Sequence, residues 1–290
     1  MGKLYARIFV LFAMTFFTFS VSAEDSLVDI RIRPPQSEND ISHHFFRQLI
    51  SAALVDNSGY RVVVESIDNL TQDRGFQLLK QKRLDLYWAG VNPLRVNQFR
   101  VVGVPLTMGL LGYRLPVIKR KDIPLFNSLD ENQLKDLRAC QGSQWPDSDI
   151  LEHNGYRVIR SPKFKMMYRM LSGGRCHYFP RGLNEVYGEV ASFEDLGRPD
   201  DLIVYERLIL KYRLPMVFFV HKDNEHLAMA LEQGLRNLVD SGRLKQFLTE
   251  HPVTQDAFPL SRFSNSQLLE LDNPLLNIDL PEDSKYWLEF

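Results

Sequence analysis

Segments with strand and helix patterns alternate along the first hundred residues, and this order restricts the fold more than any other feature. Residues 27–33 alternate apolar and polar side chains until Pro34-Pro35, which predicts a strand. Predicted strands and helices then alternate through residues 27–33, 45–54, 61–66, 71–79 and 84–88. Because the connections are short, this order indicates a parallel sheet covered by helices, which is an α/β fold.

The middle of the chain repeats the same alternation. Strands are predicted at 137–140, 157–159 and 176–179, and helices at 147–152 and 164–171. Residues 214–220 then form the most hydrophobic strand pattern outside the N-terminal stretch. Apolar side chains at helical spacing predict one long amphipathic helix after it, over residues 227–247.

The chain is therefore predicted to leave one α/β lobe near residue 115 and to return to it near residue 215. The first lobe would contain residues 24–115 and 215–290, with the tail from 252 wrapped on it, and the second lobe residues 116–214. Two crossings make a hinge, and a hinged pair of lobes closes around a ligand.

The N-terminus has the pattern of a secretory signal peptide over residues 1–23. Lys3 and Arg7 precede a short apolar run, and Val21-Ser22-Ala23 gives the small residues of a cleavage site after Ala23. A retained membrane anchor is the alternative, but the run is short for a span of about 20 residues. The first cysteine is Cys140, so no lipid anchor is expected at the new N-terminus. These features predict a protein that diffuses freely in the bacterial periplasm.

Composition and motifs exclude several classes of function. The chain has 290 residues and a net charge of −1, so its overall charge does not favour binding to nucleic acid or anionic lipid. The sequence has no serine-nucleophile, zinc-protease, Walker or dinucleotide motif. His43 and His44 are adjacent and would point about 100° apart on a helix, which does not suit a shared metal ion. We expect no cofactor, no metal and no nucleic-acid partner, and a monomeric protein.

Cys140 and Cys176 are the two cysteines of the chain. Export to an oxidising compartment predicts that they pair. Closing their 36-residue span would contribute roughly 3–4 kcal/mol in the chain-entropy model. Two buried free thiols are the alternative.

Three segments resemble the polar-amino-acid (family 3) solute-binding proteins of ABC transporters. They are residues 84–95, which end in Asn92-Pro93-Leu94-Arg95, residues 136–143, which end in Gln141-Gly142-Ser143, and residues 171–178, which contain Gly174-Arg175. They lie in the family's order and spacing, and the resemblance covers most of residues 27–250. It implies a two-lobed type II periplasmic-binding-protein fold, with a mostly parallel sheet flanked by helices in each lobe. Residues 178–186 look like those of a divergent branch.

The resemblance implies roles for individual residues of the cleft. Arg95 falls at the position of the family's carboxylate-binding arginine, where a guanidinium makes a bidentate pair. Trp88 and Gly90 fall where the family lines the cleft. Ser143 and Gln144 fall at a helix N-terminus whose N–H groups hold an anion. From the residues alone, Arg95 also fits a solvated loop and Trp88 also fits the core.

One departure from the family concerns the ligand. The acidic residue that binds the ligand's amine should follow the strand ending at Phe179, but Pro180-Arg181-Gly182 stands there. Either the ligand is an anion without an amine, which we favour on the sequence, or Glu185 substitutes as the amine's partner. Arg181 would then contact the ligand, unless it pairs with Glu185 or Glu189 on the surface. One arginine of the first strand, Arg31 or Arg33, also reaches the cleft end of the sheet.

The sequence thus predicts capture of a small polar, anionic ligand, an amino acid or an organic acid, in an interlobe cleft. The predicted role is delivery to an inner-membrane permease of a transporter. A sensing role beside a membrane signalling protein is the alternative. A dehydratase-like enzyme on the same fold, with Glu185 as a general acid, is less favoured.

Overall fold

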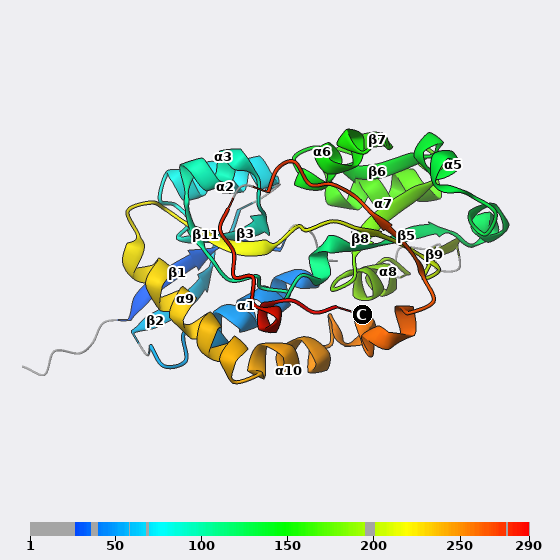
Figure 1. Ribbon diagram of the computed structural model, residues 1–290. Coiled ribbons are helices and arrows are strands. Elements are labelled where there is room, and N and C mark those ends of the chain that lie inside the picture. Colours follow the sequence, from blue (N-terminus) through cyan, green and yellow to red (C-terminus); the bar gives the residue numbers. More distant parts are fainter. Residues whose placement is uncertain are drawn as a thin grey trace, which may run out of the picture.

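The structure is a computed structural model that describes residues 27–35, 40–57, 59–67, 70–194, 201–276 and 278–289. The predicted signal peptide, residues 1–23, lies outside these described ranges. Figure 1 shows two lobes side by side, each built on a sheet with helices on its faces. Among the described residues, no helix is long and apolar enough to cross a membrane.

The first lobe contains a five-stranded sheet in the order β2-β1-β3-β11-β4. Its strands are β1 (Val28–Ile32), β2 (Tyr60–Val64), β3 (Leu86–Gly90), β4 (Arg100–Val102) and β11 (Met216–Val220). Its helices are α1 (Ser42–Ala53), α2 (Gln72–Lys80), α3 (Pro93–Gln98), α9 (Glu225–Asp240) and α10 (Arg243–Glu250). Side chains of β3 alternate between the faces, so that Trp88 packs with α1 and α9 while Tyr87 packs with α2.

The second lobe contains a seven-stranded sheet in the order β12-β10-β5-β8-β6-β7, with β9 also paired to β5. The strands are β5 (Tyr113–Lys119), β6 (Arg138–Gly142), β7 (Arg157–Ser161), β8 (Tyr178–Gly182), β9 (Leu202–Val204), β10 (Leu208–Lys211) and β12 (Gln267–Glu270). The helices are α4 (Ile123–Phe126), α5 (Glu131–Asp136), α6 (Pro146–His153), α7 (Phe164–Ser172) and α8 (Val186–Glu194). Hydrophobic side chains of both lobes belong to one buried cluster that continues through the junction.

The prediction of mostly parallel sheets is confirmed. The one antiparallel strand in each sheet directly follows a crossing between the lobes. In the described part of each sheet, one strand runs against the others: β11 in the first lobe and β5 in the second. Each is the strand by which the chain enters its lobe, after the crossings 103–112 and 212–215. The two crossings run together, because Tyr212 N donates to Gly112 O at 3.0 Å and Leu106 N donates to Met216 O at 2.9 Å.

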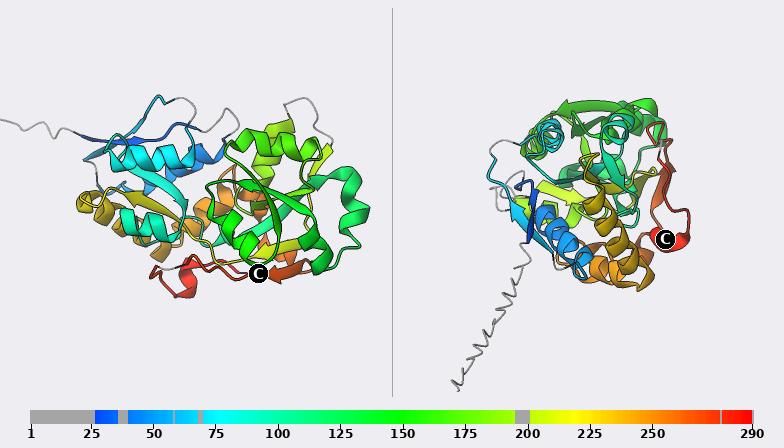
Figure 2. Two further views of the ribbon diagram at one scale, coloured as in Figure 1. Left: turned by 90° about the horizontal axis from the view of Figure 1, so that it is seen from above. Right: turned by 90° about the vertical axis from the view of Figure 1, so that its left-hand side faces the viewer.

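Two expectations about the C-terminal part are wrong. The long helix predicted over 227–247 is broken into α9 and α10, because Gly242 has φ of 73°, which ends one helix and starts the next. The tail does not lie on the first lobe alone. Its strand β12 pairs in parallel with β10 of the second sheet, and the chain then returns, where Leu288 N donates to Met108 O at 2.8 Å. Figure 2 shows the tail along one flank of both lobes.

The predicted disulfide is present in the structure. Cys140 on β6 and Cys176 just before β8 are joined, with their Cα atoms 5.5 Å apart, and both side chains are fully buried. The bond ties β6 to the segment that leads into its parallel neighbour β8. The alternative of two free thiols is therefore excluded.

The close contact of the crossings gives a first prediction. A Cβ atom at Gly112 would lie 2.2 Å from the main-chain oxygen of Tyr212, so Gly112→Ala must push the two crossings apart. We expect this overpacking to lower the free energy of unfolding by about 1–3 kcal/mol in urea titrations. At Gly59 an added Cβ meets nothing within 4 Å, and Gly59→Ala is the matched control. Equal stability of both variants and the wild type would show that the crossings are not packed as described.

Candidate functional site

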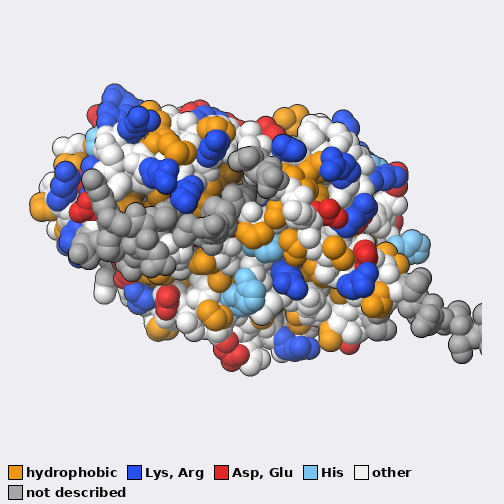
Figure 3. Space-filling model, turned by 180° about the vertical axis from the view of Figure 1, so that it is seen from behind, with side chains coloured by type: hydrophobic (Ala, Val, Ile, Leu, Met, Phe, Trp, Pro, Cys, Tyr) orange, Lys and Arg blue, Asp and Glu red, His pale blue; other side chains and the backbone are white. Residues whose placement is uncertain are grey.

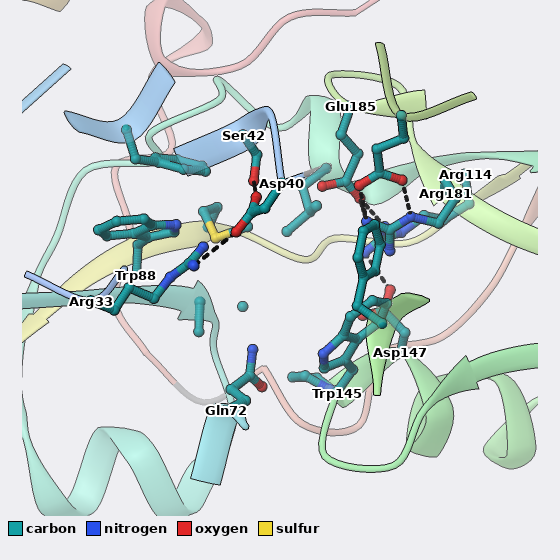
Figure 4. A pocket seen from close by; sticks show the side chains of 18 residues that line it. Arg33, Asp40, Ser42, Gln72, Trp88, Arg114, Trp145, Asp147, Arg181 and Glu185 are labelled. Carbon is teal, nitrogen blue, oxygen red and sulfur yellow. Dashed lines mark hydrogen bonds and ion pairs between the residues drawn. The ribbon is translucent and has the colours of Figure 1, made fainter. Parts of the chain in front are cut away.

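A cavity of about 80 Å³ lies between the lobes. The wall from the first lobe consists mainly of Arg33, Asp40, Ser42, Phe46, Gln72 and Trp88. The facing wall consists mainly of Arg114, Trp145, Asp147, Arg181, Glu185 and Glu189. Figure 4 shows the two sets on opposite sides of a gap, with Gln72 and Trp145 at its lower edge. Leu111 and Met216, beside the crossings, also line it, so the cavity adjoins the hinge.

Arg33 and Trp88 dominate the wall of the first lobe. Arg33 follows β1, is 3% exposed, and pairs with Asp40 at 2.9 Å. Its guanidinium carbon lies 4.4 Å from the centre of the Trp88 ring, a cation–π contact. The backbone oxygen of Arg33 also bonds His43 Nε2 at 2.8 Å, and burial lowers the pKa of that histidine. Arg33 Nε and Trp88 Nε1 are buried and have no hydrogen-bond partner among the described residues.

Arg181 is the centre of the facing wall. It lies on β8 and donates to Glu189 at 2.7 and 2.6 Å, and it pairs with Glu185 at 2.8 Å. Tyr168 Oη also donates to Glu189, at 2.9 Å. The guanidinium lies 4.7 Å from the Trp145 ring centre, so an aromatic face covers a charge that is almost fully buried.

Arg114 joins this wall through the pairing of β5 with β8. In that antiparallel register Arg114 is opposite Gly182, beside the strand position of Arg181. Arg114 forms ion pairs with Asp147 and, at 3.3 Å, with Glu185. Tyr212 Oη donates to Asp147 at 2.6 Å, which brings the second crossing into the network. Arg114 Nε is buried without a partner in the described part of the chain.

Carboxylates outnumber arginines in the cavity wall. The described wall has three arginines, Arg33, Arg114 and Arg181, and four carboxylate residues, Asp40, Asp147, Glu185 and Glu189. Burial raises the pKa of Glu189 to about 7, although Arg181 opposes the shift. Near neutral pH the wall therefore carries a formal charge between zero and −1.

Four of the seven predicted ligand residues line the cavity: Trp88, Gly90, Arg181 and Glu185. Trp88 is both a core residue and a cavity wall. The alternative interpretation of the sequence paired Arg181 with Glu185 or Glu189 on the surface. Arg181 does pair with both residues, but the ion pairs are buried.

The other three, Arg95, Ser143 and Gln144, lie outside the cavity wall. The Arg95 guanidinium donates to Gly90 O at 2.7 Å, to Gln72 Oε1, and across the lobes to Gln144 O at 2.7 Å. Ser143 N donates to Ser161 O. The first turn of α6 carries Asp147 and Asp149, so the protein itself places negative charge at the helix end where an anion was expected.

Sequence reasoning missed Asp40, Gln72, Arg114 and Asp147 as cavity residues. Arg114 had a signal, because a charged residue inside the apolar strand 113–119 requires a buried partner. Of the two first-strand arginines, Arg33 is at the cavity, while Arg31 pairs with Asp85 at 2.7 Å away from it. In the described ranges, no group of three or more His, Cys, Asp or Glu residues is arranged to hold a metal ion.

Comparison with solved structures places the fold. The structure is similar to an amino acid ABC transporter substrate-binding protein from Streptococcus pneumoniae bound to L-arginine, at 12% identity, TM-score 0.57, over 79% of this chain and 93% of that chain. It is also similar to a periplasmic His/Glu/Gln/Arg/opine family-binding protein from Silicibacter pomeroyi in complex with lysine, at 10% identity, TM-score 0.56, over 76% and 95%.

A third similar structure is a histidine kinase sensor domain with similarity to periplasmic binding proteins, at 16% identity, TM-score 0.56, over 77% and 97%. No protein-family model and no curated protein matches the sequence. At these identities the similarity establishes the two-lobed type II periplasmic-binding-protein fold, as the sequence predicted, on a divergent sequence.

The raised pKa of Glu189 gives a second prediction. Its value in the folded protein, about 7, lies above the ordinary 4.5, so the folded state holds a proton that the unfolded chain releases between these values. The free energy of unfolding should therefore fall as the pH rises from 5 to 7, by an amount on the order of 2–3 kcal/mol from this group. In Glu189→Gln this part of the pH dependence should disappear from urea titrations. Glu250→Gln, at an exposed site, should keep the wild-type slope, and an unchanged slope in both variants would contradict the assignment.

Proposed function

We propose that this chain is an exported binding protein that captures a small polar molecule between its two lobes. The observation that carries the proposal is a set of three buried N–H donors, on residues that line the cavity, without partners in the described residues. They are Arg33 Nε and Trp88 Nε1 on the first lobe and Arg114 Nε on the second. An unsatisfied buried donor costs about 1–3 kcal/mol, so acceptor oxygens of a ligand would relieve this cost on both lobes at once.

The ion pairs of the wall narrow the class of ligand. Each cavity arginine already has a carboxylate partner, and carboxylates are in excess by one. A purely anionic ligand would therefore meet no arginine without a carboxylate partner in a buried site, which is unfavourable. We infer a ligand with acceptor oxygens and a cationic group, such as an amino acid. We assign Glu185 and Glu189 as the partners of its amine. This ligand replaces the amine-free anion that we favoured on the sequence.

The cavity limits the size of this ligand. Its volume of about 80 Å³ is well below the roughly 300–1,000 Å³ of sites for drug-sized molecules. Trp88 and Trp145 supply apolar surface on opposite walls. Closure of two such walls around one small molecule accounts for a site built equally from both lobes.

Export and delivery complete the proposal. The N-terminal pattern supports secretion to the periplasm, with a signal peptide cleaved after Ala23, and an inner-membrane permease is the partner we assign. Two of the similar structures are named as binding proteins of the transporter or periplasmic kind. The similarity to a kinase sensor domain keeps a sensing role as the second candidate. Neighbouring genes for a permease and an ATPase distinguish transport from a sensing pair with a receptor kinase.

The contacts of Glu185 favour binding over catalysis. This carboxylate pairs with Arg114 and Arg181, and it accepts a hydrogen bond from Gly182 N at 3.1 Å. All three contacts fall on one oxygen of the carboxylate, and they give Glu185 the place of an ion-pair partner within the wall. A dehydratase-like reaction with Glu185 as the acid therefore has little support.

A thermal-shift screen of the mature protein tests the proposal directly. Free amino acids, dicarboxylates and other small metabolites form the panel. A ligand at 100 times its dissociation constant should raise the free energy of unfolding by about 2.7 kcal/mol. We expect amino acids to give the shift and dicarboxylates to give none. A shift with dicarboxylates only would contradict the zwitterion assignment, and no shift with any compound would contradict small-molecule capture.

Trp88→Phe tests whether one of the three buried N–H donors binds the ligand. The variant keeps an aromatic ring but removes an N–H that lacks a partner in the described residues. The ligand-free variant should be at least as stable as the wild type, while its affinity for the ligand found in the screen should fall by roughly 5- to 10-fold, the loss of one hydrogen bond of about 1 kcal/mol or more.

Trp287→Phe is the matched control for this variant. Trp287 Nε1 donates to Pro281 O at 2.7 Å in the tail, away from the cavity. This variant should lose stability without losing affinity. Wild-type affinity in Trp88→Phe would remove Trp88 Nε1 from the site.

A further inference from the structure

Arg95 connects the two lobes through a polar contact outside the cavity. It lies on α3 of the first lobe, where Asn92 Oδ1 accepts from its backbone N–H at 2.9 Å and fixes the start of the helix. Its Nη1 donates to Gly90 O of the same lobe, and its Nη2 donates to Gln144 O of the second lobe, each at 2.7 Å. One guanidinium therefore bonds main-chain oxygens on both sides of the interlobe boundary.

Burial makes the contact to Gln144 important for Arg95. The side chain is 5% exposed, and no carboxylate within 4.0 Å pairs with it in the described ranges. The guanidinium carbon lies 4.7 Å from the Phe76 ring centre, and neutral oxygens are its hydrogen-bond acceptors. Burial without an acid partner lowers the pKa of Arg95 to about 10. A charge in this setting needs every acceptor that the surrounding chain supplies.

Gln144 supplies a second contact across the same boundary. Its side-chain Oε1 accepts from Asp73 N at 3.3 Å, at the first turn of α2 in the first lobe. The backbone and the side chain of Gln144 thus both bond the first lobe. Their neighbours Gln72 and Trp145 lie at one edge of the cavity, so the contacts close that edge (Figure 4).

We propose that Arg95 is a positioning residue that latches Gln144, so that the two lobes rest closed before a ligand arrives. This inference rests on the proposed function only in that the lobes open and close around the cavity. Arg95 holds the closed form through the protein's own main chain and does not contact the ligand. Breaking one hydrogen bond to a charged donor should lower the closed-to-open ratio roughly 10- to 100-fold.

The experiment measures the distance between the lobes without any ligand. Spin labels on Val55→Cys and Leu125→Cys, exposed sites in the first and second lobes, report the opening by pulsed electron resonance in the disulfide-bonded protein. The wild type should show one short distance. Arg95→Ala should add or shift to a longer one, and Gln144→Ala, which keeps the backbone oxygen, should give a smaller change.

Arg61→Ala is the matched control. Arg61 is an exposed arginine of the same lobe that pairs with Asp29 at 2.7 Å, and within the described ranges it has no hydrogen bond or ion pair to the second lobe. Its distance distribution should equal that of the wild type. Circular dichroism and the urea midpoint show whether each variant is folded. Arg95→Met keeps the length of the side chain but cannot donate to Gln144 O, and it provides the test if Arg95→Ala does not fold.

Two outcomes would overturn the latch. One is a wild type that is already open without ligand, and the other is a pair of folded variants, Arg95→Ala and Gln144→Ala, that stay as closed as the wild type. Because no ligand is present, either result leaves the ligand screen to decide the proposed function separately. If the wild type is open without ligand and still binds its ligand, the latch proposal is wrong and the proposed binding role stands.

Discussion

The carboxylates around Arg114 and Arg181 are the constraint on which the site depends. Both guanidinium groups are almost fully buried, and a buried charge without a partner costs several kcal/mol. Glu185 pairs with both arginines, Glu189 brings α8 to Arg181, and Asp147 brings α6 to Arg114. The second lobe therefore presents a wall whose polar groups orient one another before any ligand binds. By contrast, the first lobe contributes one ion pair and an aromatic ring.

Fold similarity and site chemistry separate at Arg95. The resemblance predicted that this arginine holds a ligand carboxylate, and the fold it implied is the fold observed. The guanidinium nevertheless bonds Gly90 and Gln144 outside the cavity wall, while Arg33, the residue after the first strand, takes a place in that wall. A fold can keep an arginine at a shared position and change what it binds, because function depends on the groups that converge there. Figure 3 shows basic side chains spread over both lobes of one face, so they do not gather there into a single site for anions.

The sequence predicted those parts of the structure that local patterns determine. Alternating and helical apolar spacing located β1, β3, β11, α1 and α7, and the export signal predicted the Cys140–Cys176 bond. The sequence did not predict β12, because four residues with mostly exposed side chains show almost no alternation of apolar and polar residues. The sequence offered Glu185 and Glu189 as partners of Arg181 at the surface, but it did not predict the buried network shared with Arg114. Its carboxylates come from α6, from α8 and from the residue before α8, which the sequence alone does not bring to one point. The prediction of one long helix was wrong at Gly242, because its left-handed backbone conformation depends on the packed structure.

The place of β12 in the second sheet has a consequence for how the protein is made. Strand β10 is hydrogen-bonded to β5 on one side and to β12 on the other, and β12 begins at residue 267 of 290. Until β12 emerges, β10 presents an open strand edge that another chain can pair with. The second lobe, whose other strands lie between residues 113 and 211, therefore reaches its final form only after residue 270 has been synthesised and has emerged. Premature termination before β12 would leave the β10 edge exposed, and we expect such a chain to aggregate through strand pairing.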